Sequence, residues 1–312
     1  MILCAGESLI DMVPDNGSFR PLAGGSVYNT AIALGRLGEP VAYLWPISRD
    51  PFGDVLLRPL AEAAVNTDLC PRTDRLTTLA LVTLTGGEAR YSFYDEGSAG
   101  RMLAPEDLPP LPGHIEALFA GGISLVPDPC GAAIEALIAR DGERLPVMLD
   151  PNIRPFFIND ADAYRARLSR LIARSDIVKL SGDDLEWLHP DVTPEDAARQ
   201  VLSQGPRLVL QTGGAAGARA HWAGDVVSAP AIRTTVADTI GAGDTFNAGV
   251  LASLRRQGVL SKEGLATITA DQIAAALTLG AQAAAITVSR PGANPPWAHE
   301  MPGANVLSEQ QS

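Results

Sequence analysis

The chain has 312 residues, of which 46% are hydrophobic and 19% charged, and its 36 acidic and 24 basic side chains give a formal net charge of -12 at pH 7. This length allows one large α/β domain or two ordinary ones, with enough apolar material for a buried core. The acidic balance argues against nucleic acid or an anionic membrane as a partner and favours a small molecule held by a local site.

Short apolar strands alternate with amphipathic helices along most of the chain. The expected strands are 2–6, 41–48, 114–122, 146–152, 176–181 and 207–214. The expected helices are 28–38, 52–65, 130–142, 164–175, 197–205 and a further one that begins near Gly241 and ends at 255–258. We interpret 274–288 as a buried helix that runs into a strand. The alternation predicts an α/β fold with a mostly parallel sheet, helices on both faces and ligands beyond the carboxyl ends of the strands.

Two segments break this alternation and are typical of β-hairpins. Residues 11–24 contain Asp-Asn-Gly between apolar runs, and residues 78–98 contain Gly-Gly between alternating Thr, Leu, Val, Tyr and Phe. We expect both hairpins to form a small β-sheet lid over the ligand edge of a single domain that spans residues 1–312. The tail after Pro291 is expected to be mostly irregular.

A glycine turn precedes a carboxylate at the start of one expected helix. Gly241, Ala242 and Gly243 carry almost no side-chain bulk, so backbone N–H groups at the positive end of the helix dipole are open to a ligand. Such a helix start favours an anion, and Asp244 stands beside it. Taken alone, the pattern is explained equally well by an aspartate that caps the helix after glycine.

A second pair of glycines stands before the helix expected at 28–38. Gly25 permits close approach of the backbone to a ligand, and Asn29 on the first turn can donate and accept hydrogen bonds. Asp11 is a further candidate for recognition of a hydroxyl group. A tight turn at Gly24 and Gly25, a surface amide and a hairpin cap explain these residues individually just as well.

Several other ligand-binding patterns are absent from the sequence. A P-loop needs Lys after its last glycine, but Lys179 and Lys262 lie in no such loop, and the protein-kinase motifs are missing. The segment 208–222 resembles a dinucleotide fingerprint but lacks the long helix that should follow. The cysteines and histidines have no zinc spacing, and 274–288 is too short for a membrane span. Unpaired cysteines and the lack of a signal peptide favour a cytoplasmic location.

Two longer motifs carry a family resemblance. The segments AGGSVYNTAIALGRLG (23–38) and DTIGAGDTFNAGV (238–250) resemble the two signature motifs of ribokinase/pfkB-type carbohydrate kinases, with GESLIDMVP (6–14) ahead of them and Gly53 between them. The resemblance covers nearly the whole chain. It implies a ribokinase-like fold and ATP-dependent phosphorylation of a sugar hydroxyl.

The resemblance also implies roles for individual residues. Asp244 would be the general base for the sugar hydroxyl, beside an anion hole formed by the amides of residues 241–243. Arg154 matches an arginine near the phosphoryl-transfer path, where its planar charge suits phosphate oxygens. By similarity, the sugar would be bound by Asp11, Gly24, Gly25 and Asn29. The nucleotide would be bound by Thr212, Gly213, Gly214 and Gly217.

The expected cation sites depart from the family pattern. Family members often carry Asn-x-x-Glu after the strand at 176–181, where the Glu helps to organise Mg²⁺, whereas this chain has Ser181 and Asp184 at those places. Asp184 can still reach a magnesium-bound water. Asp238 resembles a position near the monovalent-cation site of the family, which leaves K⁺ open as a cofactor beside ATP and Mg²⁺.

Two segments indicate which sugar is the substrate. GESLIDMVP and the hairpin segment ARYSFYDEGSAGRML look most like the corresponding segments of fructokinases, which favours fructose. Tyr91, Phe93 and Tyr94 could form a wall along one face of a sugar ring, with Arg90 on a hydroxyl or carboxylate. Packing within the lid explains these side chains about equally well. A ketodeoxygluconate or ribose-type kinase is the alternative, and so is a non-catalytic metabolite-binding protein on this scaffold. Pairing of two lids would make a homodimer.

Overall fold

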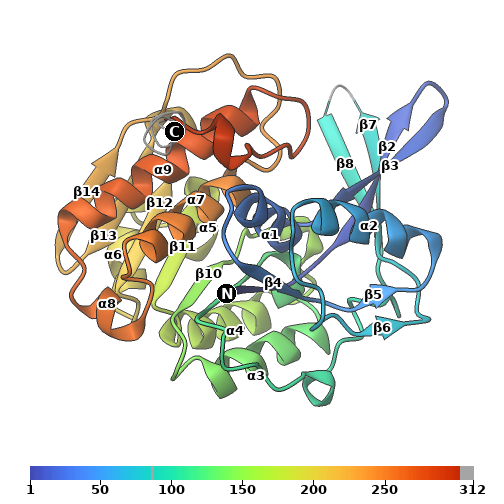
Figure 1. Cartoon of the computed structure of the whole chain (residues 1–312), viewed down its shortest axis with the longest axis horizontal. Helices are drawn as coiled ribbons and strands as arrows, with labels where there is room; N and C mark the ends of the chain where they lie inside the picture. Colours follow the sequence, from blue (N-terminus) through green and yellow to red (C-terminus); the bar gives the residue numbers. More distant parts are fainter. Residues whose placement is uncertain (86–87, 303–312) are drawn as a thin grey trace, which may run out of the picture.

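A large sheet forms the centre of the computed structural model, which describes the backbone of residues 1–85 and 88–302 and their side chains apart from those of 84, 85 and 88–90. Its strand order is β14-β13-β12-β11-β10-β9-β1-β4 (Figure 1). The strands from β12 to β4 run parallel, whereas β13 and β14 pair antiparallel at one edge. Their bounds are β1 Ile2–Ala5, β4 Val41–Leu44, β9 Ala117–Gly121, β10 Val147–Asp150, β11 Ile177–Ser181, β12 Leu208–Thr212, β13 Ala218–Trp222 and β14 Asp225–Ala229.

Helices cover both faces of this sheet, so the predicted α/β class is confirmed. The strands β1, β4, β9 and β10 are buried along their whole length, as expected for parallel strands that lie between two layers of helices. Helix α7 packs against α1 and α9, while α3 packs against α4 and α5 against α6. The helices are α1 Ser26–Arg36, α2 Pro51–Glu62, α3 Cys130–Asp141, α4 Ala161–Ala173, α5 Gly182–Leu188, α6 Pro194–Leu202, α7 Ala242–Arg256, α8 Lys262–Ala266 and α9 Ala270–Val288.

The two predicted hairpins join in one four-stranded sheet that stands away from the body beyond α2 (Figure 1). Strand β2 (Leu9–Asp15) pairs antiparallel with β3 (Ser18–Gly24) and parallel with β7 (Leu79–Thr85), which pairs in turn with β8 (Glu88–Tyr94). We call this unit the small sheet. A third, two-stranded sheet joins β5 (Ile47–Ser48) and β6 (Arg72–Thr73).

The expected strand at the end of 274–288 is wrong, because α9 continues as one helix to Val288. Its alanine-rich sequence favours helix, and the helix packs closely against α7. A Cβ on Gly249 would lie 2.7 Å from Gly280 Cα, so two glycines allow the backbones of α7 and α9 to approach. This contact holds α7, whose first turn carries Asp244.

Short 3₁₀ turns complete the described chain: η1 Pro105–Asp107, η2 Gly122–Leu125, η3 Pro155–Phe157, η4 Gly214–Ala216 and η5 Ala298–Glu300. Between the end of α9 and residue 302, η5 is the only regular element, in agreement with the irregular tail expected there. Among the described residues, no helix combines the length and the apolar character needed to cross a membrane.

Candidate active site

The two glycine-rich segments meet at Asp244. Its carboxylate accepts one hydrogen bond from Ser26 Oγ at 2.9 Å and another from Asn29 Nδ2 at 2.9 Å. Thr30 Oγ1 also donates to the backbone oxygen of Asp244 at 3.2 Å. Since these donors lie in the first turns of α1 and Asp244 lies in the first turn of α7, the packing of two helix starts brings together residues up to 218 positions apart.

Burial raises the pKa of the Asp244 carboxyl to about 6. Its hydrogen bonds from Asn29 and Ser26 act in the opposite direction, the carboxylate of Asp150 raises the pKa further, and the ammonium of Lys179 lowers it. A carboxyl with this pKa is mostly ionised at neutral pH and is a stronger base than an exposed aspartate. Asp244 therefore has the geometry and the electrostatics of a general base.

The start of α7 presents free amide groups next to this carboxylate. Gly241, the N-cap, has a φ of +77°, a left-handed conformation that favours glycine, and a Cβ there would lie 2.8 Å from Ala293 Cβ. Within the described part of the chain, no acceptor is found for the N–H groups of Gly241, Gly243 and Asp244. Ala242 donates to Thr239 O at 3.3 Å. Amides at a helix start of this kind are suited to an anion.

The backbone at Gly25, directly before α1, is closely packed. Gly25 has a φ of +122°, and a Cβ there would lie 2.4 Å from the backbone oxygen of Glu7. A Cβ on Gly24 would lie 2.4 Å from Asp11 Oδ2, a side-chain atom that can move, so the close approach to backbone requires glycine only at Gly25. Burial raises the pKa of Asp11 to about 6. Asp11, Gly24 and Gly25 thus lie together at the base of the small sheet.

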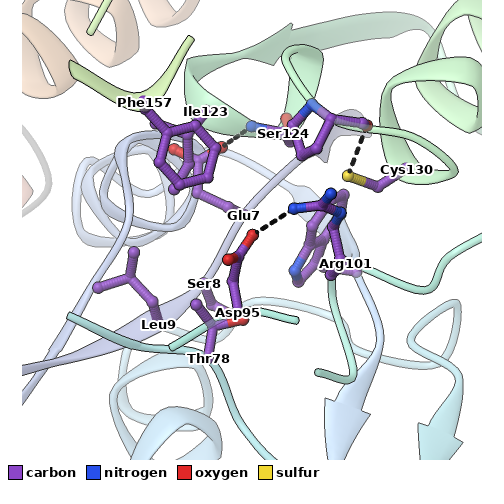
Figure 2. A pocket seen from close by; sticks show the side chains of 12 residues that line it. Glu7, Ser8, Leu9, Thr78, Asp95, Arg101, Ile123, Ser124, Cys130 and Phe157 are labelled. Carbon is purple, nitrogen blue, oxygen red and sulfur yellow. Dashed lines mark hydrogen bonds and ion pairs between the residues drawn. The ribbon is translucent and has the colours of Figure 1, made fainter. Parts of the chain in front are cut away.

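Glu7 supports the start of α1, and the sequence interpretation missed it. Its Oε1 accepts a hydrogen bond from the Ser26 N–H at 3.0 Å, and its Oε2 accepts one from the Ser124 N–H at 3.2 Å. Figure 2 shows Glu7 with Ser124 at a small cavity that is also lined by the ion pair of Arg101 and Asp95. Burial raises the pKa of Glu7 to about 7, and its N–H donors oppose this shift. Glu7 positions Ser26, which in turn contacts Asp244.

An aromatic cluster links strand β8 to the segment that follows β10. The rings of Tyr91 and Phe93 stack on Phe156 with centroid distances of 6.1 and 6.2 Å, and Phe93 meets Phe157 edge-on at 4.9 Å. A cavity of about 490 Å³ opens beside these rings. Phe93 therefore contacts the body of the protein, in a position where it can also border a ligand. The side chain of Arg90 lies outside the described residues.

Arg154 is separated from Phe156 and Phe157 of this cluster by Pro155 alone. It is exposed, and among the described residues its Nη1 donates to the backbone oxygens of Asn152 and Ile153 alone, at 3.3 and 3.1 Å. Its charge lowers the pKa of Tyr91, whose pKa is raised overall by burial and by Asp11. Arg154 and Asp11 are therefore both near Tyr91, and the guanidinium is free to bind an anion at this edge.

The glycine loop after β12 is open to solvent. Gly213 donates to Gly217 O at 2.9 Å, and Gly214 and Gly217 have φ values of +54° and +85°. Thr212 is the last residue of β12, and the loop leads into antiparallel β13. The long helix of a dinucleotide-binding unit is therefore absent at this place, as the sequence indicates.

Asp184 and Asp238 both bind backbone amides. Asp184 Oδ1 accepts from the Ile153 N–H at 2.7 Å, and its Oδ2 accepts from the N–H and the hydroxyl of Ser181 at 2.7 and 2.6 Å. Asp238 accepts from the N–H groups of Ile240 and Gly292 at 3.0 and 2.8 Å. In the part of the chain that the structure describes, no group of three or more His, Cys, Asp or Glu side chains is arranged to hold a metal ion.

Lys179 is the second functional candidate that the sequence interpretation missed. Its ammonium is buried and lies 3.2 Å from Asp150 Oδ2, which also accepts a hydrogen bond from Asn247 Nδ2 at 2.7 Å. A Cβ on Gly243 would lie 3.3 Å from the Lys179 Nζ. The sequence does contain a signal for it, a single charged residue within an apolar strand. Since a lysine is rarely buried without a partner, such a residue indicates a buried ion pair.

The chain is similar to known carbohydrate kinases over most of its length. The family model of pfkB family carbohydrate kinases matches residues 1–300. A fructokinase of Rhizobium leguminosarum bv. trifolii is 47% identical over 86% of this chain and 84% of its own, and a fructokinase of Klebsiella pneumoniae is 33% identical over 89% and 91%.

A similar fold is found in a crystal structure. The structure of fructokinase with bound ATP from Xylella fastidiosa superposes with a TM-score of 0.85 at 28% identity, covering 100% of this chain and 99% of that one. The match of the family model over almost the whole chain, together with these relatives, shows that the protein belongs to the pfkB family of carbohydrate kinases.

Proposed function

We propose that this protein is an ATP-dependent fructokinase, which transfers the γ-phosphoryl group of ATP to a hydroxyl of fructose. The observation that carries the proposal is the Asp244 carboxylate, held by Ser26 and Asn29 beside the free amides of α7. The relatives named fructokinase, one of them 47% identical, support the choice of sugar.

The proposed mechanism follows from the charges around Asp244. Its carboxylate accepts the proton of the sugar hydroxyl as the oxygen attacks, and its raised pKa makes that transfer more favourable. The amides at the start of α7 donate to the charge that develops on the transferred group, and the exposed Arg154 adds a positive charge. Bound ATP and Mg²⁺ would supply the phosphoryl group and neutralise its negative charge.

We propose that the nucleotide, Mg²⁺ and K⁺ are bound by the residues to which the sequence resemblance assigns them. Thr212, Gly213, Gly214 and Gly217 present an exposed backbone to the nucleotide. Because Asp184 already binds three donors, its fit to Mg²⁺ is through a coordinated water rather than by direct ligation. Asp238 is the candidate for a K⁺ site, and its two amide contacts leave carboxylate lone pairs for a cation.

Fructose is expected to be phosphorylated with a kcat/KM at least ~10-fold above that for ribose, adenosine or ketodeoxygluconate. The measurement is ADP release with ATP and Mg²⁺ for each of the four compounds. A preference for one of the other three would replace the sugar but keep the kinase. No turnover with any sugar, together with measurable sugar binding, would favour the non-catalytic metabolite-binding alternative.

We also propose that the chain is one domain and that the small sheet acts as its lid. The sheet carries Asp11, and its strand β8 contacts the segment after Arg154 through Phe93 and Phe156. Closure over the sugar would exclude water that could otherwise accept the phosphoryl group. Because a four-stranded sheet also has an exposed edge, two lids could pair in a homodimer.

Fructose is expected to slow amide hydrogen exchange across residues 11–24 and 78–98. Removal of the Phe156 ring, in Phe156→Ala, is expected to weaken this protection and to raise the KM for fructose, because β8 loses its stacking partner. Tyr94→Ala, which removes an exposed ring from the same strand, is the matched control. If fructose protects α1 but neither hairpin, the small sheet is structural and does not act as a lid.

The proposed location is the cytoplasm. Cys4, Cys70 and Cys130 are free and buried, and burial raises the pKa of each thiol, which keeps them unreactive. Such thiols suit a reducing compartment.

A further inference from the structure

Lys179 is a buried charge that the proposed mechanism does not use. Its side chain is 5% exposed, and within the described residues the Asp150 carboxylate is the one hydrogen-bond acceptor at its Nζ. An ammonium has three donors, and leaving two of them without an acceptor in a buried site is unfavourable. A buried ion pair of this kind gives little stability by itself, so its presence needs another explanation.

The position of the ammonium provides that explanation. Lys179 is the central residue of β11, and its Nζ is next to Gly243, in the first turn of α7. Asn247, one turn further along α7, donates to the same carboxylate oxygen of Asp150 as the lysine does. The pair of Lys179 and Asp150 therefore connects two strands of the large sheet to the helix that carries Asp244.

We propose that Lys179 is a positioning residue for phosphoryl transfer, which places a positive charge behind the amides of α7 and keeps the Asp244 carboxylate ionised. This inference rests on the proposed kinase function and adds a residue to its site. The ammonium does not touch the reacting atoms. It acts through Gly243 and through its field at Asp244.

The surrounding charges agree with this role. Burial alone would lower the pKa of Lys179, but the carboxylates of Asp150, Asp184 and Asp244 outweigh that effect and raise it, so the lysine stays protonated. At Asp244, Lys179 lowers the pKa, whereas Asp150 raises it, and Glu7 is a further acid within electrostatic range. Lys179 is therefore the positive charge that offsets several buried carboxylates.

In Lys179→Met, the acidic limb of the kcat–pH profile is expected to shift to higher pH by about one pH unit, because Asp244 loses a nearby positive charge. It is also expected to lower kcat on the pH plateau at least ~10-fold, because the anion site loses positive potential. The matched control is Lys262→Met, which removes the only other lysine together with its ion pair to Asp176, the residue that precedes β11. In Lys262→Met, both the pH of the acidic limb and the plateau value of kcat should stay at their wild-type values.

The double variant Asp150→Asn/Lys179→Met separates this role from a structural one. Removal of both charges leaves no unpaired ion, so the protein should fold with an unchanged or higher Tm. Since Asp150 and Lys179 act on Asp244 in opposite directions, the acidic limb should return towards that of the wild type while the plateau kcat stays low. A double variant with full kcat would overturn the proposal and leave the pair a replaceable salt bridge.

A carboxyl ¹³C titration provides a readout that does not depend on the substrate. The Asp244 signal, assigned by its loss in Asp244→Asn, should titrate at higher pH in Lys179→Met than in the wild type. An unchanged titration contradicts the proposal even if the enzyme is an active kinase. A shifted titration in a protein that phosphorylates no sugar would instead contradict the proposed function and keep the electrostatic coupling.

Discussion

Asp244→Asn is expected to lower kcat by at least ~10²-fold, because the amide cannot accept the proton of the sugar hydroxyl. Binding of fructose and of nucleotide should stay within several-fold of the wild type. The Asn side chain has the same shape, and its oxygen can still accept from Asn29 while its amide group donates to Ser26 Oγ. Steady-state kinetics and calorimetric binding of the two ligands measure the two effects separately.

The same proton transfer sets the pH dependence of the wild type. The base must be ionised, and its pKa is raised to about 6, so kcat/KM should fall as the pH drops below about 6. Asp162→Asn is the matched control, since Asp162 is an exposed acid in the first turn of α4. An Asp244→Asn enzyme that keeps most of its kcat would exclude the general-base role.

Gly25→Ala is expected to lower kcat/KM for fructose by about 10²-fold, since a displacement of about 1 Å in an active site has that effect. The new Cβ would lie 2.4 Å from the backbone oxygen of Glu7, and the φ of +122° strains any L-residue. The start of α1 must then move, and it carries Ser26 and Asn29, which hold Asp244.

A matched variant separates this displacement from general strain. Gly258→Ala has the same kind of positive φ, +70°, but no atom lies within 4 Å of its new Cβ. It should cost about 1–3 kcal/mol of stability or less without changing the kinetics of the folded enzyme. Kinetics normalised to the folded fraction, measured by circular dichroism, distinguish the two variants. Wild-type kinetics in Gly25→Ala would mean that the close approach to Glu7 does not position the site.

The sequence was sufficient for the elements that depend on local patterns. Alternating apolar strands and amphipathic helices predicted the α/β sheet, because burial on both faces of a parallel strand leaves a continuous apolar run. Turn chemistry predicted the first hairpin, as Asn16 and Gly17 adopt the positive φ values that such turns need. The strands of the second hairpin pair as expected, while its Gly-Gly turn at 86–87 lies outside the described residues. The strand expected at the end of α9 was wrong, because a short apolar run does not distinguish a buried helix from a buried strand.

By itself, then, the sequence determined the two helix starts, since Gly25 and Gly241 adopt positive φ values that few other residue types adopt, and it placed the carboxylate of Asp244 in the first turn of α7. The tertiary structure decided which side chains act on that carboxylate. Ser26, Glu7 and Lys179 come from separate elements, and only the packing of β1, β11, α1 and α7 makes them neighbours. The physical reason is that hydrogen bonds and charge interactions depend on distance in space, which the spacing of residues along the chain does not specify.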